Sequence, residues 1–431
     1  MKYNKVPLGD LITVLTDYHA NGAYQKLKEN VELLDDEDYA LMVRTTNFES
    51  NDFSDSLKFI SEHAYNFLEK SKVYGGDLIM NKIANAGSIY LMPDLKRPVS
   101  LAMNLFLIRV DEQKANPVYV YIFLKINEAY VKQFANGSVT KTITKDAVRN
   151  LEISLPPREV QNEIANQYNS LSKKIAVNSR INKILEEMAQ AIFKSWFVDF
   201  DPVKAKMNGE QPEGMDAATA SLFPDKLVES ELGSIPEGWS ASSMGEHFNI
   251  TMGQSPKGET YNEEGEGIAF FQGRRDFGFR YPDVRVYTTD PKRFAKAGDT
   301  LISVRAPVGD KNMAAIDCCI GRGVAAIKHK SDSRSFTYAF MSHIEKKLGD
   351  SGSSGTVFSS INQKELKKVS FVAPPQELIE AFHKIVDPID QKVEVLSKEI
   401  ESLSSLRDTL LPKLLSGEIE LGQAQELAEV E

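Results

Sequence analysis

The chain has 431 residues, which is long for one hydrophobic core, so we expect two or three domains. Its composition is that of an ordinary globular protein, and no apolar run approaches the roughly 18 residues of a membrane-spanning helix. The net charge of −10 at pH 7 argues against a simple nucleic-acid binder.

Charge is distributed unevenly along the chain. Residues 1–150 carry 18 basic and 19 acidic side chains, and residues 237–375 carry 19 and 16. The acidity lies in 207–236, with 1 basic against 6 acidic residues, and in 376–431, with 5 against 13. Each of the two near-neutral regions can therefore carry a local basic face.

The N-terminal residues and the cysteines indicate the cellular compartment. Met1-Lys2-Tyr3-Asn4-Lys5 leads into no apolar stretch, so we expect no secretory signal. The two cysteines, Cys318 and Cys319, are adjacent and cannot form a disulfide framework, so we interpret them as two buried small side chains. A reducing, cytoplasmic location is expected.

The first segment, 1–155, is predicted to be a globular module of mixed α/β structure. Short β-rich runs at 77–80 and 105–110 are separated by turn signals, and a helix is predicted near 118–133.

A long helix is predicted in the segment 156–206. Pro156-Pro157 favours a helix that begins just afterwards, and residues 158–200 contain neither proline nor glycine. Apolar residues recur mostly in steps of three or four, which places them on one stripe of a helix roughly 60 Å long. The stripe consists of Ile164, Tyr168, Leu171, Ile175, Ile181, Leu185, Met188, Ile192 and Trp196. A helix of this length needs a partner helix, because one small domain cannot cover it.

Residues 207–236 are acidic and rich in glycine and proline, and we interpret them as a linker to a second module, 237–373. The second module contains a β-rich run at 299–304 and a predicted helix near 336–348. Like the first module, it is predicted to be mixed α/β.

A second apolar stripe lies in the segment 374–421, which begins with Pro374-Pro375 and precedes a short tail, 422–431. The stripe consists of Phe382, Val386, Ile389, Val393, Leu396, Ile400, Leu403, Leu410 and Leu414, with Arg407 at one seam position. Pro388 is expected to kink or interrupt this helix. The two stripes could belong to unrelated surface helices or to an antiparallel pair.

An internal repeat favours the pair. The corresponding marks of the two halves are Leu8-Gly9-Asp10 with Met244-Gly245-Glu246, Gly76-Asp77 with Gly298-Asp299, Gly87 with Gly309, Ile143 with Ile361, and Pro156-Pro157 with Pro374-Pro375. The marks keep one order, and their offset changes where loops differ in length, as a diverged duplication requires. Each half is therefore predicted to be a module followed by a long helix.

The duplicated order resembles the specificity subunit of type I restriction-modification systems. The marks that carry the resemblance are Leu155-Pro156-Pro157-Arg158-Glu159-Val160-Gln161, Ala373-Pro374-Pro375-Gln376-Glu377, Ala191-Ile192-Phe193-Lys194-Ser195-Trp196-Phe197 and Leu410-Leu411-Pro412-Lys413-Leu414-Leu415-Ser416-Gly417. The resemblance covers nearly the whole chain, and Pro388 departs from the pattern. It implies an α+β fold in which two mixed α/β target-recognition domains are joined by two long helices, packed as an antiparallel coiled coil with a pseudo-twofold internal repeat.

The resemblance also implies a function. Each target-recognition domain would read one half of a bipartite, asymmetric target in double-stranded DNA, and the helix pair would set the spacer between the halves. The implied partners are two modification (methyltransferase) subunits and the restriction (endonuclease and translocase) subunits, with no membrane involved. The chain itself would be non-catalytic and would bind no cofactor, because S-adenosylmethionine, ATP and Mg²⁺ would be held by the partner subunits.

The sequence contains no convincing catalytic, cofactor or metal motif. The segment 253–260 has the glycines of a phosphate loop, but Glu259 occupies the lysine position, where a carboxylate would repel phosphate. The six histidines show no paired ligand spacing. The alternatives to a DNA-specificity subunit are a protein-binding coiled-coil adaptor and a stand-alone DNA methyltransferase or nuclease.

Candidate DNA contacts lie in corresponding loops of the two modules. Arginine can bridge O6 and N7 of guanine, glutamine can contact adenine in the same way, and hydroxyls and further cations suit phosphates. The candidates in the first module are Arg44, Thr45, Asn47, Lys82, Ser138 and Lys141. The candidates in the second module are Gln272, Arg274, Arg275, Arg305, Ser354 and Thr356. A solvated loop is the alternative interpretation of each.

Overall fold

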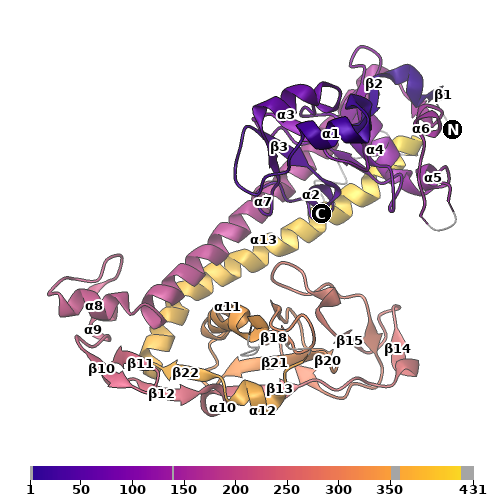
Figure 1. The fold of residues 1–431 in the computed structure, drawn as a ribbon. Helices are drawn as coiled ribbons and strands as arrows, with labels where there is room; N and C mark the ends of the chain where they lie inside the picture. Colours follow the sequence, from indigo (N-terminus) through magenta and orange to yellow (C-terminus); the bar gives the residue numbers. More distant parts are fainter. Residues whose placement is uncertain (1–2, 138–139, 351–359, 419–431) are drawn as a thin grey trace. The chain divides into compact units, whose positions relative to one another are not determined.

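The computed structural model describes residues 3–137, 140–350 and 360–418. The chain divides into two compact units, Met1–Ile175 with Glu401–Glu431, and Ala176–Ile400. Each unit contains one module and a part of both long helices, α7 (Arg158–Phe197) and α13 (Gln376–Ser416) (Figure 1).

The module of the first unit is a mixed α/β structure. Its elements are β1 (Asn4–Pro7), β2 (Ile12–Asp17), α1 (Tyr24–Asn30), β3 (Ala40–Val43), α2 (Thr45–Glu49), β4 (Phe59–Ile60), α3 (Glu62–Phe67), β5 (Leu78–Asn81), β6 (Ile89–Leu91), β7 (Val99–Leu101), β8 (Leu105–Val110), α4 (Pro117–Ile126), α5 (Glu128–Lys132), α6 (Lys145–Arg149) and β9 (Glu152–Leu155). The central sheet is antiparallel with the strand order β2-β8-β5-β6. In the adjoining sheet, β4-β3-β7, strands β3 and β7 are parallel, and β1 pairs separately with β9.

The central sheet of this module is buried on both faces. Phe106 and Ile108 of β8 pack in one hydrophobic cluster with Tyr119 of α4. Leu105 and Leu107, which point to the opposite face, pack in another cluster with residues of β3 and β7. A strand buried on both faces is apolar at nearly every position, which explains the unbroken apolar run of β8.

The module of the second unit has the same plan. Its elements are β12 (Ser240–Ser243), α10 (Met244–His247), β13 (Phe248–Met252), β14 (Tyr261–Asn262), β15 (Ile268–Phe271), β16 (Tyr287–Thr288), β17 (Phe294–Ala295), β18 (Thr300–Ser303), β19 (Lys311–Met313), β20 (Cys318–Ile320), β21 (Val324–His329), α11 (Arg334–Asp350), α12 (Gln363–Lys367) and β22 (Ser370–Ala373). The central sheet has the order β13-β21-β18-β19 and the adjoining sheet the order β14-β16-β15-β20-β17, in which β15 and β20 are parallel. Strand β12 pairs with β22.

The matching strand orders confirm the predicted repeat. The glycine marks also perform the same task in both copies. Gly76 and Gly298 have φ angles of +89° and +88°, and the amide of each donates to a carbonyl over 2.9 Å. This left-handed region favours glycine, so both turns keep it. The amides of Gly87 and Gly309 likewise close equivalent turns after β5 and β18, over 2.9 and 3.0 Å.

The two long helices pack together along much of their length and run antiparallel (Figure 1). In the second unit, Asn178 Nδ2 donates to Glu399 Oε2 over 2.9 Å, and Asn182 Nδ2 donates to Ser397 Oγ over 3.2 Å. As the residue number rises along α7 it falls along α13, which defines the antiparallel direction. Helix α13 is continuous through Pro388, so of the two expected outcomes, a kink or an interruption, the interruption is absent.

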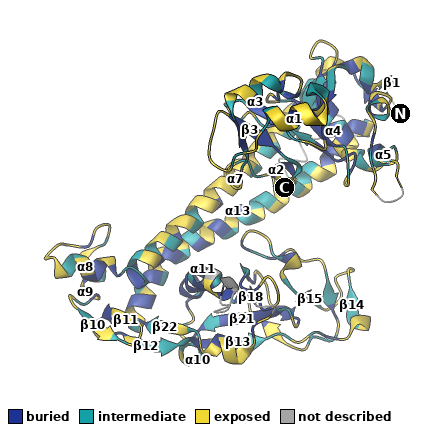
Figure 2. Cartoon of the chain, viewed as in Figure 1, coloured by how far each residue is buried: buried dark blue, intermediate teal, exposed yellow. Residues whose placement is uncertain are grey.

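The seam of α7 differs from the predicted apolar stripe near the middle of the helix. Ile181 and Met188 were expected in the seam, but they are 37% and 48% exposed. Asn178 and Asn182 are buried in their place, at 6% and 1% exposure. The prediction for Ile181 and Met188 is wrong. Apolar periodicity considers only apolar side chains, so it cannot detect amides that are buried in the seam because they form hydrogen bonds across it. Figure 2 shows this mixture of buried and exposed residues along α7 and α13.

Within each unit, the helices complete the core of the module. In the first unit, Ile164 of α7 and Leu410, Leu411 and Leu414 of α13 belong to the same buried cluster as β8 and α4. In the second unit, Phe382 of α13 is fully buried and packs against aromatic side chains of both α7 and α11. The module and the helix segments of a unit therefore fold as one body.

The segment after α7 is folded rather than an extended connection. It contains α8 (Asp201–Met207), α9 (Ala217–Ser221), and an antiparallel hairpin of β10 (Leu227–Ser230) and β11 (Gly233–Pro236). Phe223 from this segment is buried against Trp196 of α7, with ring centroids 5.2 Å apart.

Candidate nucleic-acid interface

Three loops of the second module meet in a surface hollow. The hollow is lined by Gln272, Gly273, Arg274, Arg275, Ser303, Arg305, Ala306, Arg322 and Gly323, and we call it the arginine hollow. The loop after β15 meets the turn between β20 and β21, where Gly323 N donates to Gln272 O over 3.1 Å. The end of β18 joins them because Val304 N donates to Gly323 O over 2.9 Å. The structure thus brings together the candidates Gln272, Arg274, Arg275 and Arg305.

The close approach of these loops depends on glycine. A Cβ atom added to Gly323 would lie 2.4 Å from Gln272 O, and one added to Gly321 would lie 3.0 Å from Gln272 Cα. Any larger residue at Gly323 would therefore separate the two loops. In the sequence Gly321-Arg322-Gly323, the two glycines let the turn approach the backbone of Gln272, and this places Arg322 beside the loop after β15.

The arginine hollow is cationic. Arg274 Nε forms an ion pair with Asp310 Oδ2 over 2.8 Å, and both side chains keep substantial exposure, at 50% and 35%. Arg275, Arg305 and Arg322 are exposed, and none of them forms an ion pair with a residue that the structure describes. Several guanidinium groups near one glutamine amide provide donors for base edges and for phosphates.

Arg322 is a member of this surface that the sequence analysis did not include among the candidates. Its position in the hollow follows from the parallel pairing of β15 with β20, which places the ends of both strands at the same edge. A basic residue between two glycines after a β-rich run was the available signal.

The corresponding loop of the first module follows β3, which pairs in parallel with β7 as β15 does with β20. Arg44 and Thr45 are half-buried there, and Arg44 Nη2 donates to Ser56 O over 2.6 Å. Asn47 is 4% exposed, its Oδ1 accepts from Arg44 N over 3.0 Å, and its Nδ2 donates to Asp52 O over 3.2 Å. The amide of Asn47 therefore holds the loop together and is not available to a base edge in this structure.

The two lysine candidates of the first module lie on neighbouring segments. Lys82 follows β5, and its ammonium forms an ion pair with Asp17 over 2.9 Å, where Lys145 also approaches at 3.4 Å. Burial raises the pKa of the Asp17 carboxyl, but the two lysines outweigh it and lower that pKa below its ordinary value. Lys141 is exposed, beside the β-bridge between Ile83 and Thr142. Lys82 is thus partly neutralised, whereas Lys141 is accessible.

The remaining predictions concern three further candidate DNA contacts, metal ligands, the two cysteines and membrane-spanning helices. Ser138, Ser354 and Thr356 lie outside the described residues. Within the described ranges, no group of three His, Cys, Asp or Glu side chains could hold a metal ion. Cys318 and Cys319 are buried and free, and burial raises the pKa of the Cys318 thiol to about 12. Of the helices that the structure describes, none is long and apolar enough to cross a bilayer.

Comparison with known proteins identifies the family. Residues 1–187 and 236–405 match the family described as "Type I restriction modification DNA specificity domain". A putative type I restriction enzyme MjaX specificity subunit from Methanocaldococcus jannaschii is 30% identical over 374 residues, which cover 84% of this chain and 83% of that protein. The HindI specificity subunit from Haemophilus influenzae is 28% identical over 414 residues, covering 81% and 88%.

A solved structure supports the fold. The type I restriction-modification S subunit from M. genitalium has a TM-score of 0.56 and 17% identity, and the match covers 96% of each chain. With its duplicated modules, its packed long helices and a family match across both halves, the chain belongs to the family of type I restriction-modification DNA specificity domains.

Proposed function

We propose that this protein is the DNA-specificity subunit of a type I restriction-modification complex, in which each module reads one half of a bipartite target. The observation that carries the proposal is the pair of corresponding loops after β3 and β15. They lie on the same strand framework but present different polar side chains, Arg44 and Thr45 in one module and Gln272, Arg274 and Arg275 in the other. Equal frameworks with unequal contact residues suit two readers of different sequences.

The helix pair is proposed to set the spacer between the half-sites. A helix rises about 1.5 Å per residue, so removing one heptad from each helix shortens the pair by about 10 Å. This length corresponds to about three base pairs at 3.4 Å each. Deletions matched across the seam are expected to change the accepted spacer and to leave both half-sites unchanged.

The test is target mapping with the assembled complex. Methylated sites are sequenced in hosts that carry the original chain, the matched deletion, or a deletion in α7 alone. A changed half-site, with the spacer retained, would refute the role of the helices. Absence of any bipartite methylated target with the original chain would refute the specificity function itself.

The modification subunits are proposed to bind the outer face of α7. Val177, Ile181, Ile184 and Met188 are 48%, 37%, 46% and 48% exposed, and their spacing places them on one side of the helix. An exposed apolar stripe on a long helix suits the apolar face of a partner helix. In this proposal, S-adenosylmethionine, ATP and Mg²⁺ are bound by the modification and restriction subunits, and the complex acts in the cytoplasm.

Charged substitutions test this surface. Ile184→Glu combined with Met188→Glu is expected to abolish co-purification of the modification subunits, because the partner face would have to bury two carboxylates. Lys183→Glu, at an exposed position on the same helix, is the matched control and is expected to retain them. Retention of the partners by the double variant would place their binding site elsewhere.

A further inference from the structure

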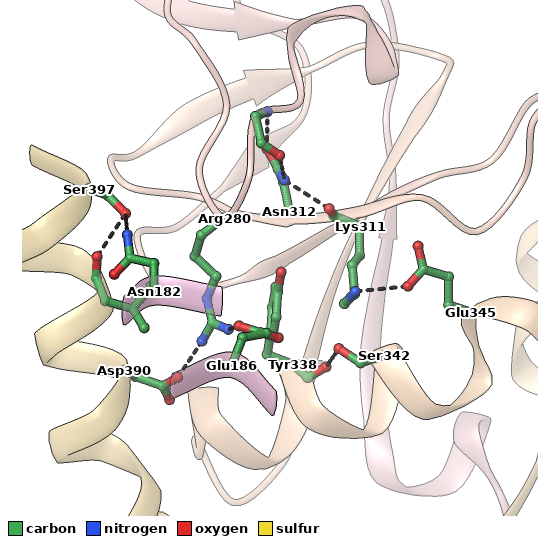
Figure 3. Close-up of polar contacts among 12 residues, drawn as sticks. Asn182, Glu186, Arg280, Lys311, Asn312, Tyr338, Ser342, Glu345, Asp390 and Ser397 are labelled. Carbon is green, nitrogen blue, oxygen red and sulfur yellow. Dashed lines mark hydrogen bonds and ion pairs between the residues drawn. The ribbon is translucent and has the colours of Figure 1, made fainter. Parts of the chain in front are cut away.

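A buried arginine joins the second module to both long helices. Arg280 lies just after the loop that forms part of the arginine hollow and is 2% exposed. Its Nη1 forms an ion pair with Glu186 of α7, and its Nη2 forms one with Asp390 of α13 (Figure 3). Its guanidinium also lies over the ring of Tyr338 of α11, 3.5 Å from the centroid. One side chain thus contacts three helices, and we call Arg280, Glu186 and Asp390 the arginine junction.

The arginine junction is connected to the candidate DNA-binding loop through β19. Met313 N donates to Arg280 O over 2.8 Å. Asn312 and Gly278 exchange two hydrogen bonds, of 3.0 and 2.9 Å, and Asn312 is fully buried. The segment from Gln272 to Arg280 is therefore held at the hollow at one end and at the helices at the other.

The same part of the seam contains the buried amides. The hydrogen bond of Asn182 to Ser397 (Figure 3) and that of Asn178 to Glu399 extend the polar contacts along the helices from Asp390. A polar residue in a helix seam fixes the register of the helices at a cost in stability. Asn182 Oδ1 and Asp390 Oδ2 are buried and have no hydrogen-bond partner among the described residues, which is where that cost is visible.

Stability alone does not explain the arginine junction. Replacing buried ion pairs by apolar residues of similar volume is often neutral or stabilising, whereas leaving one buried charge without its partner is strongly destabilising. We therefore expect the arginine junction to contribute little to the free energy of unfolding. It does penalise any other placement of the helices, because a slip of one turn, about 5.4 Å, separates Arg280 from a carboxylate.

We propose that Arg280 is a positioning residue: with Glu186, Asp390 and the buried amides, it fixes the helix register and the seat of the second module, and so restricts the spacer that the complex accepts. The inference rests on the proposed DNA-specificity function. A slip of one turn corresponds to about 1.6 base pairs, so a fixed register is needed to distinguish spacers that differ by a single base pair.

The experiment replaces the arginine junction by apolar side chains in the full chain, assembled with its modification subunits. The variant Arg280→Met/Glu186→Leu/Asp390→Leu removes all three charges together, so that no buried charge lacks a partner. The probes are duplex DNAs that keep both half-sites and differ in spacer length, and duplexes that keep the spacer and differ at one base. The matched control, Lys296→Met/Asp317→Leu, removes an exposed ion pair of 2.6 Å from the same module.

The expected result is an unchanged preference for both half-sites and an altered response to the spacer. The ratio between the preferred spacer and one a base pair longer should fall at least about tenfold, which corresponds to about 1.4 kcal/mol of lost register energy. The control should keep the original ratio. A folded triple variant that keeps the original ratio would overturn the proposal.

A second variant covers the case in which the triple variant does not fold. Asn182→Leu leaves the ion pairs intact and makes one buried polar position of the seam apolar, so it should raise the melting temperature and still broaden the accepted spacers. A more stable variant with unaltered spacer preference would also overturn the proposal. The proposed function fails separately, if the original complex shows no spacer preference at all.

Discussion

Arg274 provides a quantitative test of the arginine hollow. Its ion pair with Asp310 is 2.8 Å long and exposed, so we expect it to contribute about 0.2–1 kcal/mol. A two-point contact between arginine and guanine discriminates against other bases by about 1–3 kcal/mol. We therefore expect a contact of this kind to outweigh the ion pair, so that Arg274 leaves Asp310 when DNA binds.

The magnitudes lead to opposite expectations for the two partners. Arg274→Ala should weaken binding to the preferred second half-site by about 1–2 kcal/mol, which is roughly 5- to 30-fold, and should relax selection at one base position. Asp310→Ala frees the guanidinium and removes a negative charge, so it should strengthen binding by up to about fivefold. Neither substitution should alter selection in the first half-site.

The assay is competition binding of the assembled complex to duplexes that carry single-base changes in one half-site or the other. Lys296→Ala is the control, because its ion pair with Asp317 is also exposed but lies outside the arginine hollow. An equal loss on every duplex would make Arg274 a phosphate contact, and no loss at all would remove it from the interface. Weaker binding by Asp310→Ala would refute the competition between Asp310 and DNA.

Three further predictions concern stability. Phe382→Ala, at a fully buried position, should lower the free energy of unfolding by about 3–5 kcal/mol in chemical denaturation, whereas Phe279→Ala, at 56% exposure, should change it by less than about 0.5 kcal/mol; equal losses would contradict the packing. Burial, together with nearby charge, lowers the pKa of His329 from 6.5 to about 4, so the unfolded chain takes up its proton first as the pH falls. Stability should therefore decline between pH 6.5 and 4 by up to about 3 kcal/mol from this residue, and His329→Phe should reduce the decline; an unaltered pH profile would show that His329 is not responsible. Gly76→Ala and Gly298→Ala should each cost about 1–2 kcal/mol, because both positions have a positive φ; a loss at only one position would show that the two turns are not equivalent.

Much of the architecture could be predicted because its determinants are local or repeated. The two helices are indicated directly by the proline pairs that precede them, by the absence of proline and glycine from residues 158–200, and by the apolar stripe of α13. The glycine marks indicate the duplication, since positive φ angles and close contacts exclude other residues at the same turns. The loops after β3 and β15 were matched correctly for the same reason: each follows a buried strand in the same place of the repeat.

The arrangement of the candidate interface could not be predicted in the same way. Arg322 lies in the arginine hollow because β15 pairs in parallel with β20, and a basic residue between two glycines does not by itself reveal that pairing. Asn47 has a side-chain amide of the kind that can contact a base edge. In the structure, however, this amide is buried and forms two hydrogen bonds with the backbone of its own loop. Residue type alone does not distinguish a polar group that faces solvent from one that is satisfied inside the protein.

The sequence by itself determined the repeated modules, the two helices and the order in which they follow, because turn geometry and helical periodicity act over a few neighbouring residues. Only the tertiary structure decided which polar residues are buried in the seam and where Arg280 lies. Its position depends on Glu186 and Asp390, which are distant in sequence and come from two different helices. A buried charge is tolerated only where such partners converge, and that convergence is a property of the packed fold.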